Sequence, residues 1–182
     1  MRKHIHILFA LGMIALGVGV VRPQAEKMIS EAWKPVLDGM QRVPAADDKF
    51  VEIDEPGSYV VFLEGPADAP AWQTNDTYVQ LVDRRGKDVL PSQIVDYEYE
   101  TGGRRGQGIV KVRATTAGSY EVSFSSTQPE LLANGGFQFG IAAADLVKDQ
   151  SWKATQCYIG AIAVAAMLGV FAVFSFTQRP QS

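Results

Sequence analysis

Between residues 47 and 145, hydrophobic and polar side chains alternate with a period of two, which is the pattern of strands with one buried face. In residues 119–125, Tyr120, Val122 and Phe124 alternate with serines and a glutamate. The same alternation occurs in residues 95–100, 110–113 and 137–141, and residues 77–83 form another predicted strand. Residues 59–63 are apolar at every position, which is typical of a strand buried on both faces.

Turn-forming dipeptides separate these strands, among them Pro56-Gly57, Gly102-Gly103 and Ala117-Gly118. Short strands without long helical gaps between them favour an antiparallel arrangement over alternating strands and helices. We therefore expect an all-β domain over residues 47–145. Its expected fold is an antiparallel β-sandwich of seven or eight strands, immunoglobulin-like or jelly-roll-like.

The pattern changes at both ends of the chain. Residues 154–176 carry no charge, and as a helix they would span about 34 Å against a hydrocarbon core of about 30 Å. We predict a transmembrane helix over residues 152–178 and a short cytoplasmic tail over 179–182. Residues 5–21 form a shorter apolar run after the basic residues Arg2 and Lys3.

Two interpretations of residues 1–21 stay open. A basic start, an apolar stretch and a small-residue cleavage site would indicate a secretory signal peptide. The segment has no A-x-A pattern, so we favour a retained signal anchor or transmembrane helix. Short basic flanks stay in the cytoplasm. We therefore expect a bacterial inner-membrane protein with both termini cytoplasmic and an extracytoplasmic, periplasmic central domain.

Residues 22–46 mix charged residues with apolar ones at helical spacing. Proline in a helix interior removes a hydrogen bond and clashes with the preceding turn, so Pro35 predicts a kink or restart. We expect a juxtamembrane broken amphipathic helix followed by a linker. Within the apolar ends, Ala15 and Gly19, and likewise Ala161 and Ala165, lie four residues apart and predict close helix packing.

Charge and composition exclude several classes of function. All 20 acidic residues lie between residues 26 and 149, so the centre of the chain is acidic and nucleic-acid binding is not expected. The only histidines are His4 and His6, and the only cysteine is Cys157. Histidine-based triads, cysteine nucleophiles and the usual zinc sites are therefore excluded from the central domain. We expect no cofactor and no enzymatic activity; a hydrolase using two carboxylates is the less favoured alternative.

Two groups of charged residues are candidate sites. Asp96, Glu98 and Glu100 lie on one face of a predicted strand and could contribute oxygen ligands to calcium, although alternating acids more often form a solvated face. Arg104 and Arg105 follow two glycines and predict a basic hairpin tip. Such a tip could bind carboxylates or phosphates of a partner, and a simply solvated tip is the alternative.

A Gly-Ser-Tyr sequence occurs twice at the start of an alternating segment, with Tyr59 and Tyr120 as its tyrosines. Glycine permits a tight entry to a strand, and a buried tyrosine ring needs a hydrogen-bond partner for its hydroxyl. We expect both hydroxyls to reach a backbone group. We interpret the recurrence as two similar strand entries and not as a duplicated domain.

Four segments carry a resemblance to a known family: residues 50–53, 56–64, 78–86 and 117–122. Together they resemble the bacterial pre-peptidase C-terminal type of extracellular β-sandwich, over about residues 48–143. The resemblance implies a noncatalytic binding or spacer module, and it transfers no site residue. We expect a membrane-anchored envelope protein whose partners are the lipid bilayer and another envelope or membrane protein. A ligand-binding module for carbohydrate or calcium is the alternative.

Overall fold

The computed structural model describes residues 12, 15, 17–45, 50–69, 77–83, 88–89, 91–134 and 136–177. The chain divides into two compact units. One consists of Met1–Ala32 with Trp152–Ser182, and the other of Trp33–Ser151. We call the second the β unit. It includes residues 33–46, which the sequence pattern grouped with the juxtamembrane segment.

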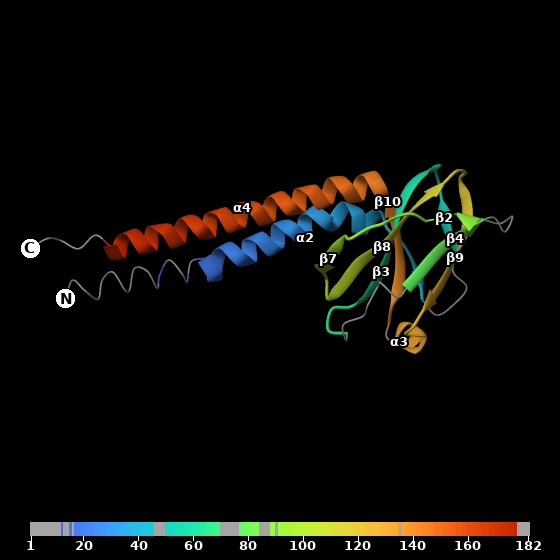
Figure 1. Cartoon of the computed structure of the whole chain (residues 1–182), viewed down its shortest axis with the longest axis horizontal. Coiled ribbons are helices and arrows are strands. Elements are labelled where there is room, and N and C mark those ends of the chain that lie inside the picture. The colour runs from blue at the N-terminus through green and yellow to red at the C-terminus, as the bar shows by residue number, and fades with distance from the viewer. Residues whose placement is uncertain are drawn as a thin grey trace, which may run out of the picture. The chain divides into compact units, whose positions relative to one another are not determined.

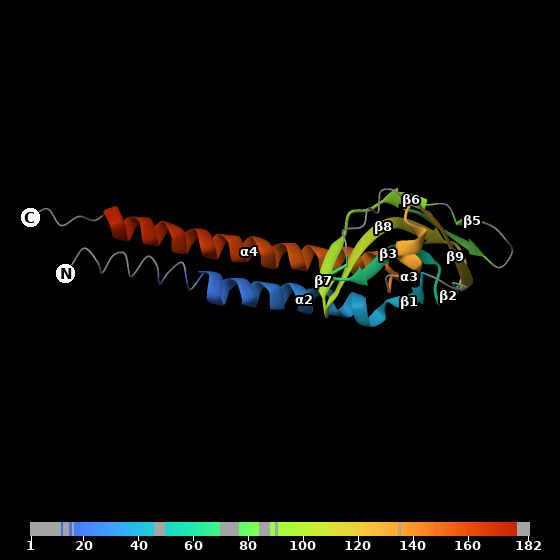
Figure 2. The ribbon, with the colours of Figure 1, turned by 90° about the horizontal axis from the view of Figure 1, so that it is seen from below.

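The strands of the β unit form two antiparallel sheets (Figures 1 and 2). The described strands are β1 (Gln41–Pro44), β2 (Phe50–Ile53), β3 (Gly57–Pro66), β4 (Thr77–Asp83), β5 (Asp88–Val89), β6 (Pro91–Ile94), β7 (Glu98–Thr101), β8 (Arg104–Ala114), β9 (Gly118–Ser126) and β10 (Gln138–Ala143). The six-stranded sheet has the order β1-β10-β3-β8-β6, with β7 also paired to β8, and the four-stranded sheet has the order β2-β9-β4-β5. The all-β prediction is confirmed, with ten described strands where seven or eight were expected.

The alternation predicts the faces of these strands well. In β9, Tyr120 and Val122 are buried and Glu121 is exposed, as expected. In β3, the central strand of the larger sheet, every residue from Val60 to Gly65 is buried. Val61 and Leu63 belong to one hydrophobic cluster that includes residues of both sheets. Burial of these strands in a shared core supplies the main free energy that holds the two sheets together.

The larger sheet also has its second face covered, by the ends of two helices. The helix α2 (Arg22–Gly39) contributes Trp33 and Val36, and the helix α4 (Ala144–Thr177) contributes Val147. All three side chains are buried. A sheet covered on both faces explains why residues 59–63 carry no polar alternation.

Three local expectations need correction. The helix α2 includes Pro35, so the predicted restart of the helix does not occur; Trp33 and Val36, on either side of the proline, are both buried and hold the last turns in place. The segment 95–100 is a strand only from Glu98 onward. A short helix, α3 (Pro129–Asn134), lies in a region where the sequence pattern indicated only strands and turns.

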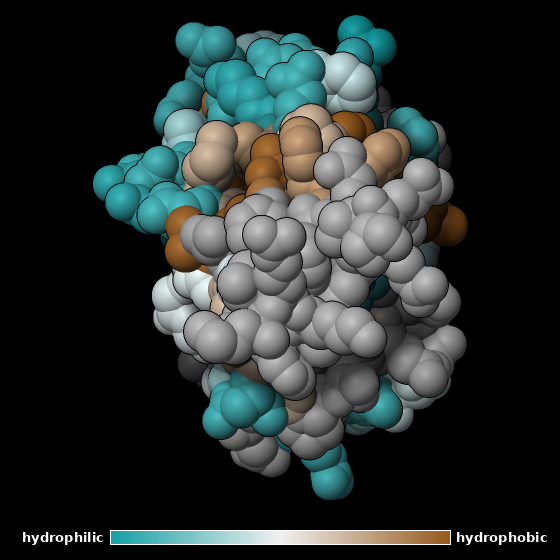
Figure 3. All heavy atoms as spheres, turned by 90° about the vertical axis from the view of Figure 1, so that its left-hand side faces the viewer, coloured by the Kyte–Doolittle hydropathy of each residue, from teal (hydrophilic) through white to brown (hydrophobic). Residues whose placement is uncertain are grey.

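The helix α4 begins earlier than expected, at Ala144 directly after β10. The stretch Ala144–Phe171 is the one described helix that is long and apolar enough to cross a membrane. Most of residues 1–21, the predicted anchor, lie outside the described part of the chain; Gly17–Val21 form a π-helical turn. On the face presented in Figure 3, hydrophobic side chains lie together at the surface beside hydrophilic ones.

Candidate functional site: a buried carboxylate and an open pocket

Glu64, near the end of β3, is the one carboxylate buried in the described part of the chain, with 1% of its surface exposed. Arg42 of β1 donates from Nε to Oε2 over 2.8 Å, and Gln138 of β10 donates from Nε2 to the same oxygen over 2.5 Å. The Tyr99 hydroxyl of β7 donates to Oε1. Three strands far apart in the sequence therefore meet at this one side chain.

Burial alone would raise the pKa of Glu64. The hydrogen bonds from Arg42, Tyr99 and Gln138, together with the charge of Arg42, nevertheless hold that pKa below its ordinary value. Burial and the neighbouring carboxylate of Glu64 raise the pKa of Tyr99. At neutral pH the cluster therefore holds an ionised Glu64 and a protonated Tyr99. Because its oxygens are satisfied within the protein, this carboxylate serves to join strands and is not a general acid or base open to a substrate.

An aromatic cluster covers this carboxylate. Trp33 packs edge-on against Phe62 with ring centroids 6.4 Å apart, and lies 5.3 Å from the ring of Tyr99. Tyr99 in turn lies over Gly106 of β8, its cross-strand partner, where a side chain would collide with the ring. The glycine thus makes the close approach of ring and strand possible.

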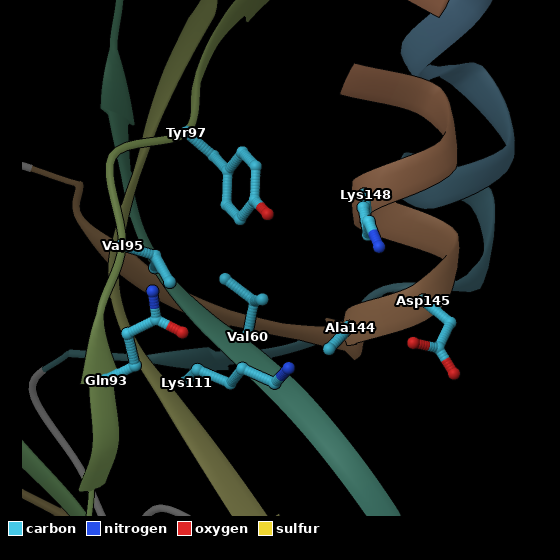
Figure 4. Close-up of a pocket in the computed structure, with 8 residues that line it drawn as sticks. All are labelled: Val60, Gln93, Val95, Tyr97, Lys111, Ala144, Asp145 and Lys148. Atoms are coloured by element: carbon cyan, nitrogen blue, oxygen red, sulfur yellow. The ribbon is translucent and has the colours of Figure 1, made fainter. Parts of the chain in front are cut away.

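A pocket of about 310 Å³ opens on the same outer face of the larger sheet (Figure 4). The lining residues come from β3, β6, β8, the segment between β6 and β7, and the first two turns of α4. They are Val60, Gln93, Val95, Tyr97, Lys111, Ala144, Asp145 and Lys148. Figure 4 shows the Tyr97 side chain extending from the strand side toward the helix that carries Lys148.

Sheet register and backbone hydrogen bonds place these side chains. Lys111 stands opposite Val60 on one side and Gln93 on the other, so the three form one row across the sheet. The backbone of Tyr97 is tied to β8, since its carbonyl accepts a hydrogen bond from Gly108 N–H over 2.7 Å. The strand side of the pocket is therefore built on backbone that is hydrogen-bonded to β8, both in β6 and in the segment that follows it.

The structure does not bring the three predicted calcium ligands together around a candidate metal position. Asp96, Glu98 and Glu100 are all exposed, and Glu98 forms an ion pair of 3.6 Å with Arg105. Across the residues that the structure describes, no group of three or more His, Cys, Asp or Glu residues could hold a metal ion.

The predicted basic tip also takes a different form. Gly102 and Gly103, both with positive φ, make the two-residue turn, and Arg104 and Arg105 begin β8 beyond it. Arg104 is half-buried and donates from Nη2 to the carbonyl of Gly136 over 3.1 Å and to that of Glu64 over 3.4 Å. Arg104 therefore links the hairpin of β7 and β8 to Glu64 of β3 and to Gly136. Of the two arginines, Arg105 is the one that forms an exposed ion pair.

The small residues predicted to pack helices are mostly uncovered. Ala15, Gly19 and Ala165 are exposed, and Ala161 is partly buried. A methyl group added at Gly19 would meet no atom within 4 Å. Since most of residues 1–21 lie outside the described part of the chain, the packing of these positions stays a prediction.

Sequence reasoning missed the residues that the structure brings together. Glu64 and its partner Arg42 are 22 residues apart, and the pocket lysines, Lys111 and Lys148, are separated by 37. The one available signal was the acid that ends the otherwise apolar strand at residue 64.

Comparison with protein-family models, curated proteins and solved structures finds no match to this chain.

Proposed function

We propose that the chain is a noncatalytic, membrane-anchored envelope protein whose β unit binds another envelope or membrane protein. The observation that carries the anchoring is the surface of α4. Only 6% of its most apolar window is buried within the protein, and large hydrophobic side chains such as Ile162, Met167 and Phe171 are more than half exposed. Exposed apolar surface of this extent requires a cover, and a bilayer covers all sides of a helix at once.

The chain order of the strands supports the jelly-roll form of the proposed sandwich. Strands β1 to β4 alternate between the sheets, and so do β8 to β10. The larger sheet thus contains β1, β3, β8 and β10, and the smaller one contains β2, β4, β5 and β9. Strands β6 and β7 are additional and lie one after the other along β8, where β6 pairs with residues 110–112 and β7 with residues 104–107. Double-sheet jelly rolls occur in many noncatalytic binding domains, which agrees with the resemblance to the pre-peptidase C-terminal type of module.

A surface for the protein partner lies on the outer face of the four-stranded sheet. Phe50 of β2 and Tyr78 of β4 point away from the shared core and are 54% and 50% exposed. Aromatic residues are enriched among the residues that dominate binding energy in protein interfaces. The extracytoplasmic orientation is part of the same proposal and follows from the basic residues at the two ends of the chain.

The test is purification of the full chain from native membranes in mild detergent, with mass spectrometry of the proteins that accompany it. We expect one stoichiometric partner, and we expect Phe50→Ser with Tyr78→Ser to release it. Ile94→Ser is the matched control, because Ile94 is an 85% exposed hydrophobic residue on the other sheet. A chain that purifies alone, or a partner retained by the double variant, would contradict the proposed surface.

A further inference from the structure

The pocket on the larger sheet is lined by more basic than acidic side chains, whereas the β unit that contains it is acidic overall. Residues 33–151 include 18 acidic and 11 basic residues. The pocket nevertheless has two lysines, Lys111 and Lys148, and one acid, Asp145. In an acidic unit, such a pocket is a local positive site that attracts anions.

We propose that this pocket binds a phosphate group carried on a small organic moiety. Four side chains on its lining can donate hydrogen bonds: the ammonium groups of Lys111 and Lys148, the amide of Gln93 and the hydroxyl of Tyr97. A phosphate has enough acceptor positions for all four. Its oxygens are arranged tetrahedrally, which suits donors on both the sheet side and the helix side of the pocket better than a flat carboxylate does. Lysine binds phosphate as a point charge and does not need a fixed approach angle.

The size and remaining walls of the pocket define the rest of the ligand. Its volume of about 310 Å³ exceeds what a phosphate ion fills and lies at the lower end of small-molecule sites. Val60, Val95 and Ala144 provide apolar surface beside the donors (Figure 4). Figure 4 also shows the carboxylate of Asp145 directed away from Tyr97. The site therefore suits a phosphate ester with a short carbon group.

Two sources share this chemistry. Along α4, Lys148 precedes Ala154, the first residue of the charge-free run, by six residues, which is about 9 Å of helical rise. Lipid headgroups occupy a layer of roughly 5–8 Å on each side of the hydrocarbon core. If α4 is the anchor proposed above, a phospholipid headgroup is within reach of the pocket. A soluble phosphate ester reaches the pocket whether or not the chain is anchored.

The experiment uses the full chain in neutral detergent micelles at low salt. The probes are dihexanoyl phosphatidylglycerol, glycerol 3-phosphate and inorganic phosphate, with glycerol as the phosphate-free control. Binding is measured by titration calorimetry and by native mass spectrometry. We expect saturable binding of at least one phosphate probe, and a Kd about tenfold weaker in each of Lys111→Gln and Lys148→Gln.

Lys153→Gln is the matched control, because Lys153 lies on α4 five residues beyond Lys148 and does not line the pocket. Its affinity should stay within twofold of the unmodified chain. Gln93→Ala removes a donor without changing charge and should weaken binding about threefold. The unfolding temperature without probe shows that each variant is folded.

Binding of the lipid probe alone identifies a headgroup as the source, and equal binding of glycerol 3-phosphate identifies a soluble ester; both results support the proposal. Three results would overturn it. They are no saturable binding of any phosphate probe, equal binding of glycerol, and a loss in Lys153→Gln as large as in Lys148→Gln. The last would indicate general attraction of anions to the charge on the helix. Since the proteins that accompany the chain are scored separately, failure here leaves the proposed protein partner unaffected.

Discussion

Tyr59 and Tyr120 show how one short sequence gives the same contact twice. The hydroxyl of Tyr59 donates to the carbonyl of Glu55 over 2.6 Å, and that of Tyr120 donates to the carbonyl of Thr116 over 2.7 Å. Each bond spans four residues and closes the turn before a strand. The prediction that both hydroxyls reach a backbone group is confirmed.

The two tyrosines differ in burial, and so should the effect of removing each hydroxyl. Tyr120 is buried, and Tyr120→Phe removes the hydrogen bonds of its hydroxyl to the carbonyl and the hydroxyl of Thr116, which should cost about 1 kcal/mol of unfolding free energy. Tyr59 is partly exposed, so water can replace its hydroxyl and Tyr59→Phe should cost roughly half as much. Urea unfolding of both variants measures the difference. Equal losses would show that burial does not control the contribution of this bond.

Glu64 gives the β unit a defined dependence on pH. Its pKa is lower in the folded chain than in the unfolded one, so the stabilisation by the ionised carboxylate is complete above about pH 4.3. That stabilisation is lost as the pH falls through the lower, folded pKa. At neutral pH, Glu64→Gln leaves Arg42 without its counter-charge. The cost should be about 2 kcal/mol, less than for a fully buried pair, because the Arg42 side chain is 33% exposed.

The unfolding free energy of Glu64→Gln, measured from pH 7 to pH 3, should therefore approach that of the unmodified chain in acid. The matched control is Glu98→Gln, which breaks an ion pair with side chains 52% and 39% exposed and should change stability by less than about 0.5 kcal/mol. A difference between Glu64→Gln and the unmodified chain that is the same at pH 3 and pH 7 would contradict this role of the carboxylate.

At the scale of elements, the pairing of β7 with β8 determines where the aromatic cluster stands. Tyr99 of β7 faces Gly106 of β8, and its ring reaches both Trp33 and Phe62. A methyl group at residue 106 would occupy the place of that ring. The glycine is thus a requirement of packing and not of backbone conformation.

We expect Gly106→Ala to move the Tyr99 ring and to destabilise the β unit by about 1–3 kcal/mol, as overpacking does elsewhere. Its control is Gly57→Ala, where the added carbon would meet the Tyr59 ring at an ordinary 3.6 Å. The shift in unfolding temperature of the two variants is the measurement. A shift in Gly106→Ala no larger than in Gly57→Ala would show that the ring can move without cost.

Elements with local signals were predictable from the sequence, and contacts between distant elements were not. The bounds of β4 match the strand predicted over residues 77–83. In β9, Tyr120 and Val122 are buried as expected, whereas Ser119, which was expected on the outer face, is also buried. Tyr97 and Tyr99 share one predicted strand face, yet Tyr99 enters the aromatic cluster whereas Tyr97 lines the pocket. The alternation of apolar and polar residues predicts which face of a strand is buried. It does not predict which element packs on that face, because the helices that do so lie far away in the sequence.

At the scale of the whole molecule, the proposal of a membrane anchor rests on one helix. The charge-free run of α4 centres on Ala165, which is exposed in the structure. An arginine at the centre of a spanning helix costs about 2.5–3.5 kcal/mol in insertion experiments, whereas one near the end reaches the interface at little cost.

We therefore expect Ala165→Arg to move a large fraction of the chain out of the membrane pellet after alkaline extraction. Gln156→Arg places the same side chain at an exposed position near the start of the run and should leave the distribution unchanged. If both variants stay in the pellet, the other apolar end holds the chain there. If both leave it equally, added charge and not its depth is responsible.

The edges of the two sheets have a consequence for how copies behave when they are crowded together. Within the described part of the chain, every edge strand is at most four residues long: β1, β2, β5, β6 and β7. Pro44 ends one of these strands, and Pro91 begins another at a register shift. Short, proline-marked edges give a neighbouring chain few backbone groups to pair with. Copies can thus be crowded together without joining into a continuous sheet, and the protein partner proposed above would be held by side chains rather than by an added strand.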